Sequence, residues 1–176
     1  MKFTIKTEDF SSLFVVLDSE DLERYFVKNE MDSVLRKLTI CDLGSYSFAA
    51  ILCHKWSSSL ADNVVCTVEK RFFTLRPTYV IFDKQQQSVI NVRKKLNLLH
   101  HEFTITSDLE EIKYHTVGDF FGSTFSITTQ DEKEIIAKIT RTGGYTIELL
   151  DKNHDALPLI AVVIVIHLCC HHTRDE

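Results

Sequence analysis

The sequence predicts a mostly β (α+β) fold in which an antiparallel sandwich or barrel encloses one apolar helix near the C-terminus. Three observations lead to this prediction. Most of the 176 residues fall into short segments of alternating apolar and polar side chains. A unit of 24 residues repeats in the middle of the chain, and an apolar run of 15 residues near its end is too long for a strand. No stretch is typical of a linker, so residues 1–176 are expected to form a single domain.

The alternating segments are rich in β-branched and aromatic residues, and polar turns such as 42–45 and 83–87 separate them. Many short strands without intervening helical patterns are typical of an antiparallel sandwich or barrel. The predicted strands are centred on residues 3–5, 13–17, 24–28, 35–40, 46–52, 64–68, 72–75, 79–82, 89–92, 96–99, 103–105, 114–117, 124–127, 135–139 and 145–149.

The internal repeat aligns residues 65–81 without gaps onto residues 89–105. Each copy reads as a strand, a basic cluster, a strand, a polar break and a further strand. A weaker third copy runs from 114 to 127, with Gly118 and Asp119 where the basic cluster would be. A repeated hairpin unit needs neighbours to cover its apolar face, which favours a closed or meandering barrel.

The apolar run spans residues 156–170. Strands usually have 4–8 residues, so its length favours a helix, with Asp155 at the N-cap and Pro158 in the first turn. Such a helix would be about 22 Å long, short of the roughly 30 Å of a bilayer core. Because it is apolar on every face, we expect the protein to enclose it completely.

The composition excludes several classes of protein. With 44% hydrophobic and 26% charged residues, the chain is neither disordered nor collagenous. The net charge of −5 argues against nucleic acid as the main partner. The first residues contain no signal-peptide core, and the five cysteines are scattered and odd in number, so a reducing, cytoplasmic location is expected. The cysteines are Cys41, Cys53, Cys66, Cys169 and Cys170.

The order of several segments carries a resemblance to a known family. These segments are 24–28, 38–42, Glu69-Lys70-Arg71, Arg93-Lys94-Lys95, 114–120, 136–139, 145–151 and Asp155-Ala156-Leu157. From about residue 10 to 168 the chain resembles the LURF-one-related (LOR) family, including its YxjI-like members, which share the tubby C-terminal-like fold with phospholipid scramblases. The resemblance implies a closed antiparallel β-barrel of about twelve strands around a central hydrophobic helix at about residues 155–169. An acidic residue that often follows this helix in the family is replaced here by residues 167–172, so its role is not transferred.

No nucleophile motif, phosphate loop or zinc-protease motif is present, so we expect a protein that is not an enzyme and has no cofactor. His167 and His171 are four residues apart and are weak candidates for two metal ligands. Structural zinc sites favour two separated pairs of ligands, so a polar helix end without a physiological metal is the favoured interpretation.

The basic clusters are the stronger candidates for a binding site. Between residues 64 and 105, seven Lys and Arg face three Asp and Glu, although the whole chain is acidic. If the hairpins pair in register, the clusters would lie close together and attract an anionic ligand. Protection of a sheet edge, plain solvation and a protein partner are the alternatives. The candidate residues are Lys70, Arg71, Arg93, Lys94 and Lys95.

The leading hypothesis is therefore a binding or adaptor module, cytoplasmic or peripheral at the membrane, which contacts anionic phospholipid or another anionic ligand through its basic hairpins. One alternative is a membrane-anchored, scramblase-like protein that uses the apolar C-terminal segment. A second alternative is a domain that interacts only with proteins. The ligand, the physiological role and the oligomeric state stay open at this point.

Overall fold

Twelve strands and one helix make up the part of the chain that the computed structural model describes. That part comprises residues 1–7, 13–30, 37–44, 63–71, 74–95, 101–106, 112–119, 123–131, 133–151 and 155–171. The strands are β1 (Lys2–Thr7), β2 (Leu13–Leu17), β3 (Glu23–Glu30), β4 (Lys37–Asp42), β5 (Val64–Lys70), β6 (Thr78–Asp83), β7 (Ser88–Lys94), β8 (His101–Thr106), β9 (Ile112–Gly118), β10 (Thr124–Thr129), β11 (Ile135–Arg141) and β12 (Tyr145–Leu149), and the helix is α2 (Ala156–His171).

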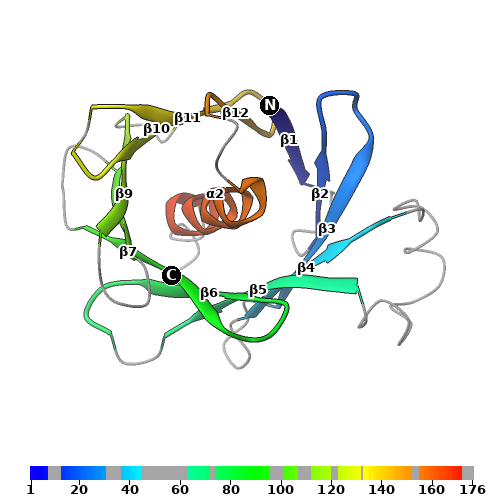
Figure 1. Cartoon of the computed structure of the whole chain (residues 1–176), viewed down its shortest axis with the longest axis horizontal. Coiled ribbons are helices and arrows are strands. Elements are labelled where there is room, and N and C mark those ends of the chain that lie inside the picture. Colours follow the sequence, from blue (N-terminus) through cyan, green and yellow to red (C-terminus); the bar gives the residue numbers. More distant parts are fainter. Residues whose placement is uncertain are drawn as a thin grey trace.

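Each strand pairs in antiparallel fashion with the strands before and after it in the chain, and β1 pairs with β12 to close the barrel. The Met1 amino group donates a hydrogen bond to the Leu149 carbonyl oxygen over 2.9 Å at this closure. The strands form a ring around α2 (Figure 1). The prediction of a closed antiparallel barrel of about twelve strands around a C-terminal helix is confirmed.

The internal repeat corresponds to successive hairpins of this barrel. β5, β7 and β9 begin at residues 64, 88 and 112, so the offset of 24 residues holds through the third copy. The strand predicted at 72–75 is wrong for Thr74 and Leu75, which lie in the loop between β5 and β6. The Arg71 N–H already donates to the Thr78 carbonyl oxygen over 2.8 Å, which closes the hairpin before those two residues. The predicted strands at 46–52 and 96–99, and residues 72 and 73, lie outside the described residues.

Helix α2 begins one residue after the predicted start and extends two residues beyond the predicted end. The Asp155 carboxylate accepts a hydrogen bond from the Leu157 N–H over 3.1 Å, which is the expected N-cap contact. Residues 159–166 are all buried, so the helix has no solvated face. Among the described helical residues, no helix is long and apolar enough to cross a membrane.

The width of the barrel explains why a helix must fill it. Eight strands enclose a space that their own side chains just fill, and a barrel of twelve strands is wider. Inward side chains such as Ile40, Val92 and Ile139 therefore pack against Val162 and Val165 of the helix in one continuous core. The chain buries an element that is apolar on all sides because the barrel surrounds it on all sides.

Candidate functional site

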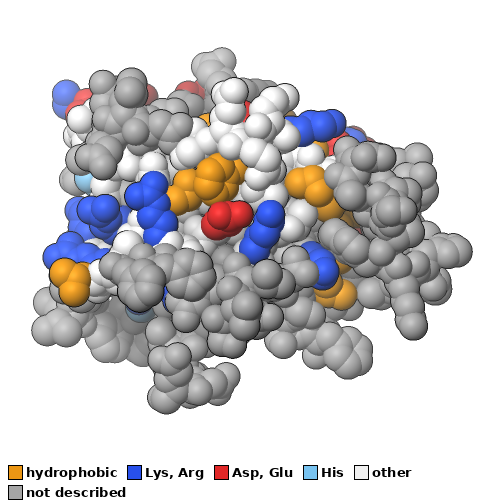
Figure 2. Space-filling model, turned by 90° about the horizontal axis from the view of Figure 1, so that it is seen from below, with side chains coloured by type: hydrophobic (Ala, Val, Ile, Leu, Met, Phe, Trp, Pro, Cys, Tyr) orange, Lys and Arg blue, Asp and Glu red, His pale blue; other side chains and the backbone are white. Residues whose placement is uncertain are grey.

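The two ends of the barrel carry opposite charge. The odd-numbered strands from β5 to β11 all end where α2 ends, and we call this the basic end. Within the described strand termini and loops of this end there are ten Lys and Arg but three Asp and Glu. The basic residues are Lys6, Lys28, Lys37, Lys70, Arg71, Arg76, Arg93, Lys94, Lys95 and Arg141, and the acidic ones are Glu69, Glu102 and Asp119. Seen from below, several Lys and Arg side chains gather at one edge of the molecule (Figure 2).

The opposite end, where α2 begins, is acidic. Its described strand termini and loops contain eleven Asp and Glu but only five Lys and Arg. The N-terminus of a helix carries a partial positive charge and the C-terminus a partial negative one, so both barrel ends complement the dipole of α2. The acidic residues are Asp18, Glu20, Asp21, Glu23, Asp42, Asp83, Asp131, Glu134, Glu148, Asp151 and Asp155.

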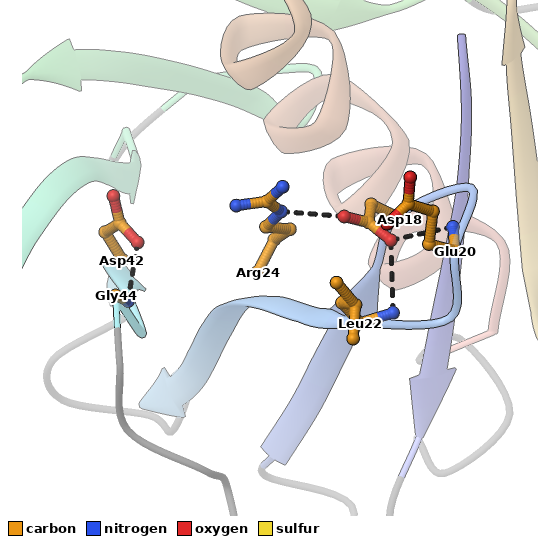
Figure 3. A network of polar contacts seen from close by, with 6 residues as sticks. All are labelled: Asp18, Glu20, Leu22, Arg24, Asp42 and Gly44. Carbon is orange, nitrogen blue, oxygen red and sulfur yellow. Dashed lines mark hydrogen bonds and ion pairs between the residues drawn. The ribbon is translucent and has the colours of Figure 1, made fainter.

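Several carboxylates of the acidic end hold turns. Asp18 accepts hydrogen bonds from the N–H groups of Glu20 and Leu22, over 2.8 and 3.1 Å, and from Nε of Arg24 over 2.7 Å (Figure 3). The hydrogen bond from Arg24 lowers the pKa of Asp18. Asp42 accepts in the same way from the Gly44 N–H over 2.8 Å. These carboxylates have local structural partners, so the acidic end is the weaker candidate for a binding site.

At the basic end, Lys94 contacts the end of the central helix. Its Nζ donates a hydrogen bond to the Cys169 carbonyl oxygen over 3.3 Å. The last carbonyl groups of a helix have no partner within it, and a cation beside them is favourable. Lys70 and Lys94 both lie close enough to the Cys169 thiol to oppose the effect of burial on its pKa. Two of the five candidate cations thus face the C-terminus of α2.

The other three candidates lie on the rim. Arg71 and Arg93 are exposed, and both align with Thr78 of the intervening strand β6. Two strand spacings separate them, which is about 10 Å between their Cα atoms. Lys95 pairs with Glu102 over 3.4 Å. The hairpins therefore bring the predicted residues to one end of the barrel, with β6 between the two clusters.

Protection of a sheet edge was one alternative explanation of these clusters, and it is wrong. β5 and β7 are each paired on both sides, because the barrel is closed. A closed barrel leaves no free edge for charged side chains to protect.

The predicted metal ligands do not form a described cluster. The His167 ring packs edge-on against Phe14 and Tyr145, with ring centroids 5.4 and 5.3 Å away. The side chain of His171 lies outside the described part of the chain. Within that part, no group of three or more His, Cys, Asp or Glu is placed to hold a metal ion. The absence of a physiological metal stays a prediction.

Four cysteine thiols of the described chain are held in the protonated form. Burial raises the pKa of Cys41 and Cys169 to about 11, and that of Cys66 and Cys170 to about 12. The thiolate is the reactive form of cysteine, so these four residues are poor nucleophiles at neutral pH.

Sequence reasoning did not assign three residues of the basic end to the candidate site. Arg76 and Leu75 lie in the loop between β5 and β6, where the sequence predicts a strand that ends at residue 75. Arg141 ends β11, and its N–H donates to the Ser123 carbonyl oxygen over 2.8 Å. Only the order of the strands around the barrel brings this arginine to the same end as the basic hairpins.

Asp119 occupies the position of the basic cluster in the third repeat and links the end of β9 to the start of β10. Its carboxylate accepts hydrogen bonds from the N–H groups of Ser123 and Thr124, over 2.7 and 3.1 Å, and from both hydroxyls. Burial alone would raise the Asp119 pKa, but these hydrogen bonds together outweigh it and lower the pKa to about 2. The preceding Gly118 fits because any Cβ there would collide with the ring of Phe125.

This depressed pKa predicts a pH dependence of stability. The carboxylate of Asp119 stabilises the fold above the unfolded-state pKa of about 3.9, and its contribution is lost as the pH falls towards 2. Replacing Asp119→Asn should therefore lower the midpoint of urea unfolding at pH 7 and flatten its fall between about pH 4 and 2. Urea titrations at several pH values measure this. If the midpoint of urea unfolding falls equally steeply with pH in wild type and variant, Asp119 is not the source of the pH dependence.

A twelve-stranded barrel filled by its C-terminal helix defines a class of β-barrel domains, and the comparisons place the chain within it. A protein of Arabidopsis thaliana, solved by X-ray crystallography, has the same fold with a TM-score of 0.64 at 14% identity. The match covers 94% of this chain and 88% of the other. The model of the LOR family, whose name is properly written LURP-one-related, matches residues 1–167. The chain belongs to the LOR family, and no curated protein matches it.

Proposed function

We propose that this protein is a non-enzymatic binding module whose basic end contacts phosphate groups of an anionic ligand. The observation that carries the proposal is the concentration of cations around the C-terminal end of α2 in a chain whose net charge is −5. An even scatter of the same residues would give no local attraction, whereas a cluster of one sign raises the local concentration of an oppositely charged ligand.

The exposed arginines are the residues best suited to such contacts. Arg71, Arg76 and Arg93 are exposed around the start of β6. A guanidinium group offers a planar set of donors that matches two phosphate oxygens at once. Two acids of this end are already paired, Glu69 with Lys37 over 3.7 Å and Glu102 with Lys95 over 3.4 Å. Their charge is therefore compensated locally and does not cancel that of the three arginines.

Two observations support a binding role over the alternatives. The protonated thiols and the lack of a nucleophile motif support a protein that is not an enzyme. The burial of residues 159–166 favours a module over a scramblase-like protein anchored by this segment, because α2 would have to leave the core to enter a membrane. Location in the cytoplasm, with contact at a membrane surface, is part of the proposal.

Reversing the exposed arginines tests it. We expect Arg71→Glu/Arg93→Glu to weaken sedimentation with vesicles of phosphatidylcholine and phosphatidylserine by at least about 30-fold, since each basic residue near an anionic surface contributes about 1 kcal/mol. Binding by the wild type should also fall as salt rises.

The matched control is Lys2→Glu/Lys84→Glu, which makes the same change of net charge at exposed positions of the acidic end. This variant should bind almost as the wild type does. Equal loss in both double variants would show a general effect of net charge. Failure of the wild type to bind either these vesicles or a soluble anion, inositol hexakisphosphate, would refute the proposal. Capture of a protein partner with no vesicle binding would favour the domain that interacts only with proteins.

A further inference from the structure

The loop between β5 and β6 places a fully exposed leucine on the rim of the basic end. The relative exposure of Leu75 is 105%, whereas the other exposed large hydrophobic residues of the described chain range from 44% to 59%. Single exposed apolar residues are common on protein surfaces. Leu75 differs from the others because its whole side chain is exposed and because exposed arginines lie on the same loop and at the strand ends beside it.

The base of this loop is fixed. The Arg71 N–H donates to the Thr78 carbonyl oxygen over 2.8 Å, and the Thr78 hydroxyl donates to the Arg76 carbonyl oxygen over 3.1 Å. The Pro77 carbonyl oxygen accepts a hydrogen bond from the Lys94 N–H over 3.2 Å. These contacts tie the loop to β6 and β7, while the side chains at residues 74–77 are all exposed. The leucine is thus presented at the end of the barrel by a well-anchored hairpin.

Three exposed cations lie on or beside the loop that carries the leucine. Arg76 follows it directly, and Arg71 and Arg93 lie at the base of the same hairpin and on the next one. In the space-filling view, an exposed hydrophobic side chain lies beside the Lys and Arg side chains gathered at one edge (Figure 2). An apolar side chain beside several exposed cations complements a surface that is anionic outside and apolar beneath.

We propose that Leu75 enters the interface of an anionic bilayer while Arg71, Arg76 and Arg93 contact its phosphate groups. This inference rests on the proposed function and narrows its ligand from any phosphate group to a membrane surface. A soluble phosphate compound can accept hydrogen bonds from the arginines but has no apolar part that Leu75 could contact. A bilayer satisfies both, because acyl chains lie directly beneath the headgroups.

The orientation of the bound protein follows from the same contacts. With the basic end against the bilayer, the acidic residues around the start of α2 point away from an anionic surface. Helix α2 stays inside the barrel, so the contact is peripheral and needs no rearrangement of the core.

The first experiment compares two exposed leucines. We expect Leu75→Ala to weaken binding to vesicles containing phosphatidylserine by about five- to tenfold, because the side chain loses part of its transfer into the interface. The control is Leu22→Ala, at an exposed leucine (53%) in the turn between β2 and β3 at the acidic end. It should change binding by less than about twofold.

A second readout locates the contact directly. An environment-sensitive fluorophore on Leu75→Cys should shift to shorter wavelengths when these vesicles are added, and the same fluorophore on Leu22→Cys should not. Wild type treated with the fluorophore in parallel corrects for native thiols, of which Cys41, Cys66 and Cys169 are buried. No shift at Leu75 would overturn the inference.

A soluble anion separates this inference from the proposed function. Inositol hexakisphosphate should bind Leu75→Ala as tightly as wild type and Arg71→Glu/Arg93→Glu far more weakly. If only the arginine variant loses vesicle binding, the inference fails and the proposed function stands. If Leu75→Ala loses the soluble anion as well, the leucine acts through the shape of the loop and the inference also fails. If wild type binds neither probe, both fail.

Discussion

Replacing Ile164→Asp is expected to unfold the protein at neutral pH. Ile164 is 1% exposed and lies at the middle of α2, where strands surround the helix on every side. An unpaired carboxylate in such a place costs several kcal/mol, and the total stability of a domain is about 5–15 kcal/mol. Near-UV circular dichroism and urea titration measure the loss.

The control for this change is Ile135→Asp, the same substitution at a residue of β11 that is 44% exposed. It should cost no more than about 1 kcal/mol, mainly through the lower strand propensity of aspartate. Similar loss at both positions would contradict the central place of the helix. The pair also tests the anchored alternative, since a helix used only as a membrane anchor could carry the aspartate without unfolding the barrel.

Replacing Lys94→Glu is expected to lower the free energy of unfolding by about 2–4 kcal/mol. The change removes a charged hydrogen bond to the Cys169 carbonyl oxygen, worth about 1.5–3 kcal/mol, and puts a negative charge beside the negative end of the helix dipole. Thermal or urea unfolding measures the change. Lys94→Met keeps most of the aliphatic side chain, so its free energy of unfolding should lie between those of Lys94→Glu and wild type.

The neighbouring Arg93→Glu provides the matched comparison, because Arg93 is exposed and lies on the outer side of the same strand. We expect it to change stability by no more than about 0.5 kcal/mol while weakening vesicle binding. Equal destabilisation by the two changes would show that Lys94 has no special contact with the helix. The comparison separates a cation that supports the fold from one that is available to a ligand.

The sequence predicts most of this fold because the fold is regular. Alternation in β5, β7 and β9 identifies strands, their spacing of 24 residues identifies the repeated hairpin, and the length of the apolar run separates α2 from a strand. Family resemblance adds the number of strands and the place of the helix inside them. The structure confirms both, and the matched family model confirms the resemblance itself.

The sequence could not predict which cations of the candidate site contact α2 and which are exposed to a ligand. Lys94 and Arg93 are adjacent in sequence, yet one faces the end of α2 and the other faces solvent. Successive side chains of a strand point to opposite faces, so the position of the helix end along β7 decides which of the two points inward. Leu75 was assigned to a strand because it follows apolar residues, and only the early closure of the hairpin between Arg71 and Thr78 shows that it lies in a loop.

The position of α2 also determines when this protein can fold during synthesis. The helix follows all twelve strands in the chain, and β1 must find β12 about 140 residues away before the ring closes. While a ribosome makes the strands, their inward side chains have no helix to cover them, so the nascent barrel exposes its apolar lining until residue 171 has left the exit tunnel. Early hairpins such as β2–β3 and β5–β6 are synthesised well before the helix, and the core is completed only when α2 follows them.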